Sequence, residues 1–330
     1  MKQLLIISGI ISFLFVGCID DRIPDDEIKL LEALDNDEYA GLDGLDMGEA
    51  EDLDHETGLE SYGAGRTFTD TLSFGEGYRI RFGREVLDKD RDVEFDIEGD
   101  TAIGAVTYNI SGNFHVKVFD TTTMAQIDSL SFVKEFTTSL FRKVRFTRHE
   151  TDANPDGYFW KVDGFTPMVG GSGDKVDING IFIYAMNDNW EQGDLLYQFL
   201  AEDVQDIFID RESIPTFTAF VPYLVTVSVS NAGPEMALDS TGVGEWVLKN
   251  YGYHRHHRGR KWLNDKGVFF DETANDNLHS GGWRTHGPGH GVDRRAFRSF
   301  FETVDLATIF VNDGGYNTAI WSIPYKVERP

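Results

Sequence analysis

The stretch IGAVTYNISGNFHVKV, residues 103–118, decides the fold class that we expect for this chain. Two kinds of side chain alternate along it, and this two-residue period is typical of a β-strand with one buried face. The face expected to be buried holds Gly104, Val106, Tyr108, Ile110, Phe114, Val116 and Val118. Ser111-Gly112-Asn113 separates two runs of this pattern, and we expect it to be the turn of a β-hairpin.

Further strands are expected on either side, so residues 66–169 are predicted to form one β-rich domain. Strand patterns recur at Leu140–Arg148 and Tyr158–Phe165, and no long amphipathic helix interrupts them. The entry at Val93–Ala102, the long hairpin and the later strand at Trp160–Val162 resemble the sheet of NTF2-like cone folds. That resemblance implies an alternative in which this first domain is an α+β cone with helices before its sheet.

A glycine-rich segment, residues 170–174, separates this domain from a second patterned block, residues 175–330. Its composition favours a flexible linker. The second block contains an alternating strand at Val225–Val229 and is expected to close with a hairpin of Thr308–Val311 and Ala319–Val327. Short strands and glycine turns predict an immunoglobulin-like β-sandwich. The whole chain is therefore expected to be mainly β, with two β-rich domains.

Residues 1–18, MKQLLIISGIISFLFVGC, have the layout of a secretory signal. Lys2 precedes an apolar run that is too short to span a bilayer permanently, and small residues precede the cysteine. The ending Phe15-Val16-Gly17-Cys18 resembles the lipobox of bacterial lipoproteins, whose cysteine is acylated and begins the mature protein. The resemblance implies an outer-membrane lipoprotein of the bacterial cell envelope, periplasmic or surface-exposed, held by acyl chains on Cys18. The alternative is an ordinary cleavage site with a spare thiol.

The chain carries a formal charge of −26, most of it near the N-terminus. Residues 19–65 hold 17 Asp and Glu against Arg22 and Lys29, a net charge of −15. We expect these residues to form an acidic tether with one short helix at Asp25–Asp37, where apolar residues recur at three-residue steps. Nucleic-acid phosphates repel so acidic a chain, and no nucleic-acid partner is expected.

The segment Asp152–Asp163 matches part of the spacing of a calcium-binding loop. Its candidate ligands are Asp152, Asn154 and Asp156 at every second position and Asp163 at the twelfth. Oxygen ligands at this spacing make calcium the one cofactor that the sequence suggests. The alternative is a hairpin turn, because Asn-Pro-Asp-Gly is good turn chemistry in its own right.

Histidines gather in the second block, where six of the nine lie within 37 residues. The candidate zinc ligands are His254, His256, His286 and His290. The alternatives are an exposed basic loop and a patch for a polyanion such as an acidic glycan. The candidate ligand-binding residues of this region are Trp262, Trp283, Arg258 and Arg260.

The sequence contains no nucleophile elbow, no phosphate-binding glycine loop and no cysteine nucleophile. We therefore expect the lipid-anchored protein to bind or scaffold without catalysis, with a glycan or another envelope protein as its partner. The alternatives are a metal-dependent hydrolase that uses the His254–His290 cluster and a calcium-stabilised carbohydrate-binding module. Stoichiometric zinc favours the first of these, and a melting temperature that falls on chelation favours the second.

Overall fold

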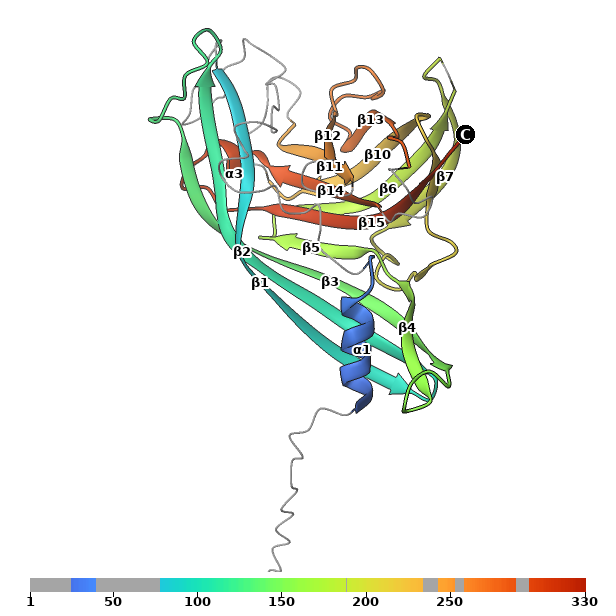
Figure 1. Cartoon of the computed structure of the whole chain (residues 1–330). Coiled ribbons are helices and arrows are strands. Elements are labelled where there is room, and N and C mark those ends of the chain that lie inside the picture. The colour runs from blue at the N-terminus through green and yellow to red at the C-terminus, as the bar shows by residue number, and fades with distance from the viewer. Residues whose placement is uncertain (1–24, 40–77, 188, 234–242, 253–257, 289–296) are drawn as a thin grey trace, which may run out of the picture.

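The computed structural model describes residues 25–39, 78–187, 189–233, 243–252, 258–288 and 297–330 (Figure 1). This part of the chain is mainly β and forms two antiparallel sheets, which confirms the expected fold class at that level. The helices are α1 (Asp25–Asp35) and α3 (Leu306–Phe310). The strands are β1 (Tyr78–Glu98), β2 (Thr101–Asp120), β3 (Phe132–Glu150), β4 (Tyr158–Phe165), β5 (Met168–Ser172), β6 (Val176–Met186), β7 (Gln192–Leu200), β8 (Ile209–Asp210), β9 (Thr216–Thr218), β10 (Pro222–Asn231), β11 (Glu245–Gly252), β12 (Arg258–Leu263), β13 (Leu278–Arg284), β14 (Phe297–Asp305) and β15 (Thr318–Glu328).

Three long strands begin the larger sheet, whose order is β1-β2-β3-β5-β15-β14-β11-β12. β2 runs without interruption through Ser111–Asn113, so the predicted hairpin turn there is wrong. The turn between β1 and β2 is Gly99-Asp100. Gly112 lies opposite a bulge in β1, where a Cβ would come within 2.0 Å of the Glu85 carbonyl oxygen. The glycine therefore marks a close approach of two backbones.

The segment expected as a flexible linker is a strand in the middle of the larger sheet. β5 pairs with β3 on one side and with β15 on the other. Gly171 lies between Ser139 of β3 and Ala319 of β15. A Cβ on Gly171 would lie 2.0 Å from the Thr318 carbonyl oxygen, so glycine here permits close strand packing. One continuous sheet runs through both of the expected domains.

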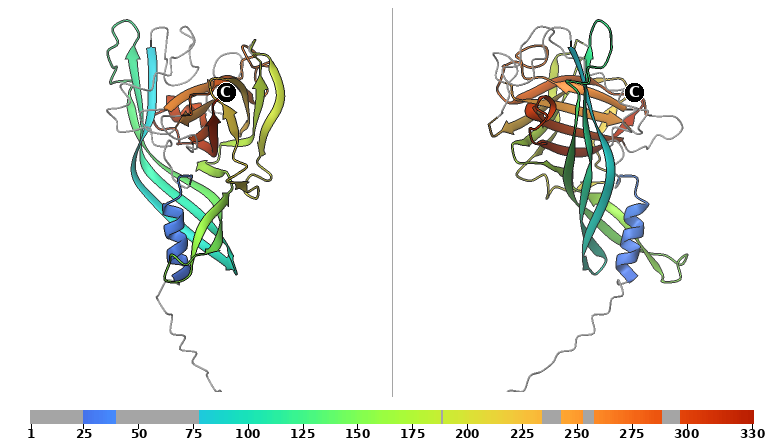
Figure 2. Two further views of the ribbon diagram at one scale, coloured as in Figure 1. Left: turned by 45° about the vertical axis from the view of Figure 1, so that its right-hand side comes forward. Right: turned by 90° about the vertical axis from the view of Figure 1, so that its left-hand side faces the viewer.

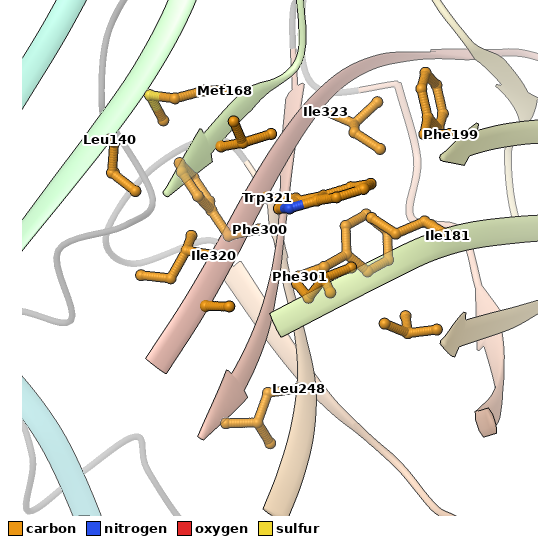
Figure 3. Packing of buried hydrophobic residues seen from close by; sticks show 14 of the residues in the cluster. Leu140, Met168, Ile181, Phe199, Leu248, Phe300, Phe301, Ile320, Trp321 and Ile323 are labelled. Atoms are coloured by element: carbon orange, nitrogen blue, oxygen red, sulfur yellow. The ribbon is translucent and has the colours of Figure 1, made fainter. Parts of the chain in front are cut away.

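The smaller sheet, of order β13-β10-β6-β7, packs on one face of β14 and β15. Figure 3 shows Ile181 of β6, Phe301 of β14 and Trp321 of β15 in this core. The start of β1 and the parts of β2 and β3 beside it form a second layer. In this layer the Phe82 ring of β1 lies 5.8 Å from the Trp246 ring of β11. Every residue of β14 is buried as a result, because both faces of the strand are covered.

The prediction of a closing hairpin between Thr308–Val311 and Ala319–Val327 was also wrong. Leu306–Phe310 is the short helix α3, where a strand was predicted at Thr308–Val311. The Asp305 side chain accepts a hydrogen bond from the Ala307 backbone amide at 3.1 Å and so caps the helix. β15 pairs instead with β14, which ends at that capping residue.

Helix α1 confirms the predicted helix, which we expected at Asp25–Asp37, and it packs against β4 (Figure 2). Its buried residues are Leu30 and Leu34, one helical turn apart, whereas Ile28 is 45% exposed. Residues 25–39 thus belong to the folded part of the chain, although they were expected within the tether. Neither described helix is long and apolar enough to cross a membrane.

Candidate functional site

A cleft of about 490 Å³ lies between helix α1 and strand β4. Its aromatic lining residues are Tyr158, Phe159 and Trp160. Its charged and amide lining residues are Lys29, Glu32, Asn36, Asp37, Asn154, Asp156, Lys161 and Arg211. The cleft therefore combines apolar ring surface with both hydrogen-bond donors and acceptors, and its lining is more polar than that of most small-molecule sites.

The cleft follows the edge of β4 that faces away from β3, most of which pairs with no other described strand. This strand pairs with β3 along its length, but β8 covers its other edge only at Gly164 and Phe165. The Tyr158 carbonyl accepts a hydrogen bond from the Asn154 side chain at 3.1 Å, and the Val162 carbonyl accepts one from Arg211 at 2.7 Å. Since backbone groups alternate in direction along a strand, those of Trp160 face this edge too.

Ion pairs and hydrogen bonds hold the walls of the cleft together. Lys29 lies 2.8 Å from Asp156 and 4.1 Å from the centre of the Tyr158 ring. Asp26 accepts hydrogen bonds from the Trp160 indole at 2.9 Å and from the Tyr158 hydroxyl at 2.7 Å. Those two bonds, the indole first, lower the pKa of Asp26 below its ordinary value. The helix and the strand are therefore joined through the aromatic residues at one end of the cleft.

Two of the predicted calcium ligands, Asn154 and Asp156, line this cleft, and three of the four contact other protein groups. Asp156 pairs with Lys29, the Asn154 amide donates to a backbone carbonyl, and Asp163 accepts a hydrogen bond from Arg145 at 2.9 Å. Asp152 lies in the exposed loop between β3 and β4, where Gly157 has a φ of 77°. The loop thus has the form of the alternative that we described, a hairpin turn.

A different group of carboxylates does converge. The ligand oxygens of Asp265, Asp271 and Asp276 all lie within 4.8 Å of one another. Asp265 is 1% exposed and accepts hydrogen bonds from the backbone amides of Asp276 and Asn277 at 3.1 and 3.0 Å. Burial, together with the two neighbouring carboxylates, raises the pKa of Asp271. Such oxygens could hold a hard cation. The sequence pattern missed the group because its members are six and five residues apart.

The predicted zinc ligands are not seen together. His254, His256 and His290 lie outside the described residues, as does Cys18. Both ring nitrogens of His286 are engaged, Nδ1 with the Gly287 carbonyl at 2.7 Å and Nε2 with the Tyr325 hydroxyl at 2.8 Å. Burial lowers the pKa of His286. This half-buried histidine packs against the rings of Phe297 and Tyr325.

The predicted ligand-binding tryptophans differ in their surroundings. Trp283 is 1% exposed and packs among buried rings, so its expected role at an exposed binding surface is corrected. Trp262 is half-buried in β12. Arg258 and Arg260 belong to the same strand, where their backbone pairs with β11 and their side chains lie outside the described residues.

A lysine that the sequence analysis did not single out is fully enclosed next to Trp283. The Lys249 ammonium nitrogen donates to the Ser299 hydroxyl at 2.7 Å and lies 3.6 Å from the centre of a Trp283 ring. The other rings around it belong to Tyr251, Phe301 and Tyr325. Burial lowers the pKa of Lys249 well below its ordinary value. The sequence signal was available, since Lys249 lies between Val247 and Tyr251 on one face of a strand.

Comparison with known proteins gives no assignment for any of these groups. No protein-family model, no curated protein and no solved structure matches the chain.

Proposed function

We propose that the chain is a lipid-anchored protein of the bacterial cell envelope that binds or scaffolds, with the cleft between α1 and β4 as its ligand site. The observation that carries the proposal is the cleft itself, which has a volume of about 490 Å³ and an aromatic and polar lining. The anchor is the Cys18 acyl group implied by the lipobox-like Phe15–Cys18.

The ligand that fits this lining best is an envelope glycan. Asn36, Asn154 and Glu32 offer amide and carboxylate groups that can exchange hydrogen bonds with hydroxyls. Phe159 is 40% exposed and offers an apolar ring edge, and Lys161 is an exposed cation that suits an acidic sugar. Several hydroxyls around an apolar ring face are characteristic of sugars.

The test is isothermal titration of the mature Cys18→Ser chain with muropeptides and with alginate oligosaccharides. We expect Phe159→Ala and Lys161→Ala together to weaken binding at least about tenfold, which corresponds to about 1.4 kcal/mol. Phe269→Ala is the matched control, because Phe269 is 85% exposed and does not line the cleft. The proposal is overturned if neither glycan binds, or if the double variant binds as tightly as the parent chain.

The hydrolase alternative draws less support from His286, whose two nitrogens already have protein partners. Elemental mass spectrometry of the same chain tests it directly. One equivalent of bound zinc would support an active site at the His254–His290 cluster. A melt with and without chelator tests the calcium-stabilised module in the same way.

The finer fold assignments belong to the same proposal. Two antiparallel sheets packed face to face support an immunoglobulin-like sandwich for β6, β7, β10 and β13 with β14 and β15. One helix on a bent antiparallel sheet supports the NTF2-like alternative for α1 with β1 to β4.

A further inference from the structure

Helix α1 is fixed to the sheet along its whole length. Near its start, Asp26 binds Tyr158 and Trp160, and Lys29 pairs with Asp156. Leu30 and Leu34 are buried in the main hydrophobic core. At its end, Asp35 lies 2.6 Å from Arg91 of β1. The helix is therefore part of the rigid fold.

Three residues that follow α1 are each held by an arginine. Arg211 pairs with the Asp37 carboxylate, and Arg298 of β14 donates to the Glu38 carbonyl. Arg142 of β3 donates two hydrogen bonds of 3.0 Å to the Tyr39 carbonyl, and its side chain is buried. If α1 swung away, Arg142 would lose this acceptor while enclosed in the core, which is costly.

This attachment leaves only a short spacer before the fold. Seven Cα steps separate Cys18 from Asp25, and seven extended residues reach at most about 25 Å. Residues 40–77, which contain much of the acidic charge, lie between α1 and β1 in the sequence. Both neighbours belong to one fold, so this segment cannot lengthen the distance from the anchor.

We infer that the end of the molecule at the start of α1 faces the membrane, with the cleft between α1 and β4 held close above it. The inference rests on the lipid anchor of the proposed function but not on its glycan ligand. The membrane-proximal parts are the turn Gly99-Asp100 and the loop of residues 151–157, which lie beside the start of α1 (Figures 1 and 2). The loop of residues 121–131 lies at the opposite end.

The partner that this surface fits is an uncharged lipid surface. Two basic side chains near this end are paired with carboxylates: Lys29 lies 2.8 Å from Asp156, and Arg148 lies 2.6 Å from Asp100. An exposed polybasic patch would be needed to add attraction to anionic lipid. The acyl chains alone therefore set the height, and zwitterionic vesicles are the appropriate test surface.

The experiment is energy transfer from a single label to acceptor lipids in phosphatidylcholine vesicles that carry the full acylated protein. Acylated Cys18 is not free to react, so Asp152→Cys in the loop of residues 151–157 and Met124→Cys in the loop of residues 121–131 each provide one thiol. β2 alone has 20 residues and spans about 60 Å, which separates the two positions widely. We expect strong transfer from position 152 and weak transfer from position 124.

Two insertions test whether the short spacer between Cys18 and Asp25 sets the distance of the fold from the membrane. Fifteen Gly/Ser residues after Arg22 add about 20 Å of root-mean-square reach, and we expect them to lower the transfer from position 152 at least about twofold. The same insertion after Gly58 is the matched control, and it should leave transfer unchanged. Equal transfer from both labels, or equal effects of both insertions, overturns the inference. Mass spectrometry of the N-terminal peptide is read first, because an unacylated Cys18 refutes the proposed anchor instead.

Discussion

Replacing Lys249 by Met should make the protein more stable at neutral pH. The side chain is 0% exposed, and among the described residues its amine donates to the Ser299 hydroxyl. Four aromatic rings fill the remaining space, the nearest with its centre at 3.6 Å. Enclosing an ammonium ion costs several kcal/mol, which favours the neutral amine in the folded protein. Methionine has nearly the same length and shape without this cost.

The size of the effect depends on pH in a defined direction. Between its folded pKa and its ordinary pKa, Lys249 is charged in the unfolded chain and neutral in the fold, because burial lowers the folded pKa well below the ordinary value. The unfolded state thus binds one more proton, and wild-type stability rises with pH by up to about 1.4 kcal/mol per unit in the window between the two pKa values. The Lys249→Met variant lacks this dependence. Its stability advantage over the wild type should therefore shrink as the pH rises through this window, by up to about 1.4 kcal/mol per unit. Loss of the hydrogen bond to Ser299 reduces the stability gain of Lys249→Met by about 1 kcal/mol at every pH.

Equilibrium urea unfolding at pH 7, 8 and 9 measures this difference. The neighbouring His286 has a pKa below its ordinary value of 6.5, mainly because it is buried, and 6.5 itself lies below the pH range of the measurement. Lys161→Met is the matched control, because Lys161 is exposed on β4. Its unfolding free energy should follow the wild-type slope. If Lys249→Met also followed the wild-type slope and was less stable at pH 7, the enclosed amine would have to be charged, and the reasoning would fail.

Two further predictions concern buried carboxylates. Asp271→Asn should raise the unfolding free energy at pH 7 in chelator by about 0.5–1 kcal/mol, since the folded pKa of Asp271 is raised and its charge is fully unfavourable above that pKa. The gain should vanish as the pH falls below the ordinary value of 3.8; a gain that persists there contradicts this account. For Glu245, burial raises the pKa, but hydrogen bonds from His279 and Asn231 outweigh it and leave the pKa below 4.5. Glu245→Gln should therefore cost about 1–3 kcal/mol at pH 7, and thermal melts should show the loss shrinking as the pH falls through the folded pKa of Glu245; a loss that does not change with pH excludes this linkage.

Local patterns predicted the local structure of this chain well. The alternation around Val106 and Val227 reports a strand with one covered face, and the acidic start and apolar spacing of residues 25–35 report a helix. These signals depend on neighbours within a few residues. The helix was placed correctly, although its buried side is set by Leu30 and Leu34 against β4, a partner more than 120 residues away.

The errors came from residues whose role depends on distant parts of the chain. Gly112 and Gly171 have the chemistry of turns and linkers, but a backbone from another strand lies against each of them. Asp305 begins a helix that the hydrophobic pattern alone could not separate from a strand. The convergence of Asp265 with Asp271, and the enclosure of Lys249, likewise depend on how loops and sheets meet in space.

The position of β5 has a consequence for whether this protein can be divided into two parts. Each half of the larger sheet meets its neighbour through this one strand, which pairs with β3 and with β15. Separating the chain at the glycine-rich segment would leave an open strand edge on the pieces, and such edges favour aggregation. The change of composition at residues 170–174 therefore does not mark a place where the protein can be divided into two independent parts.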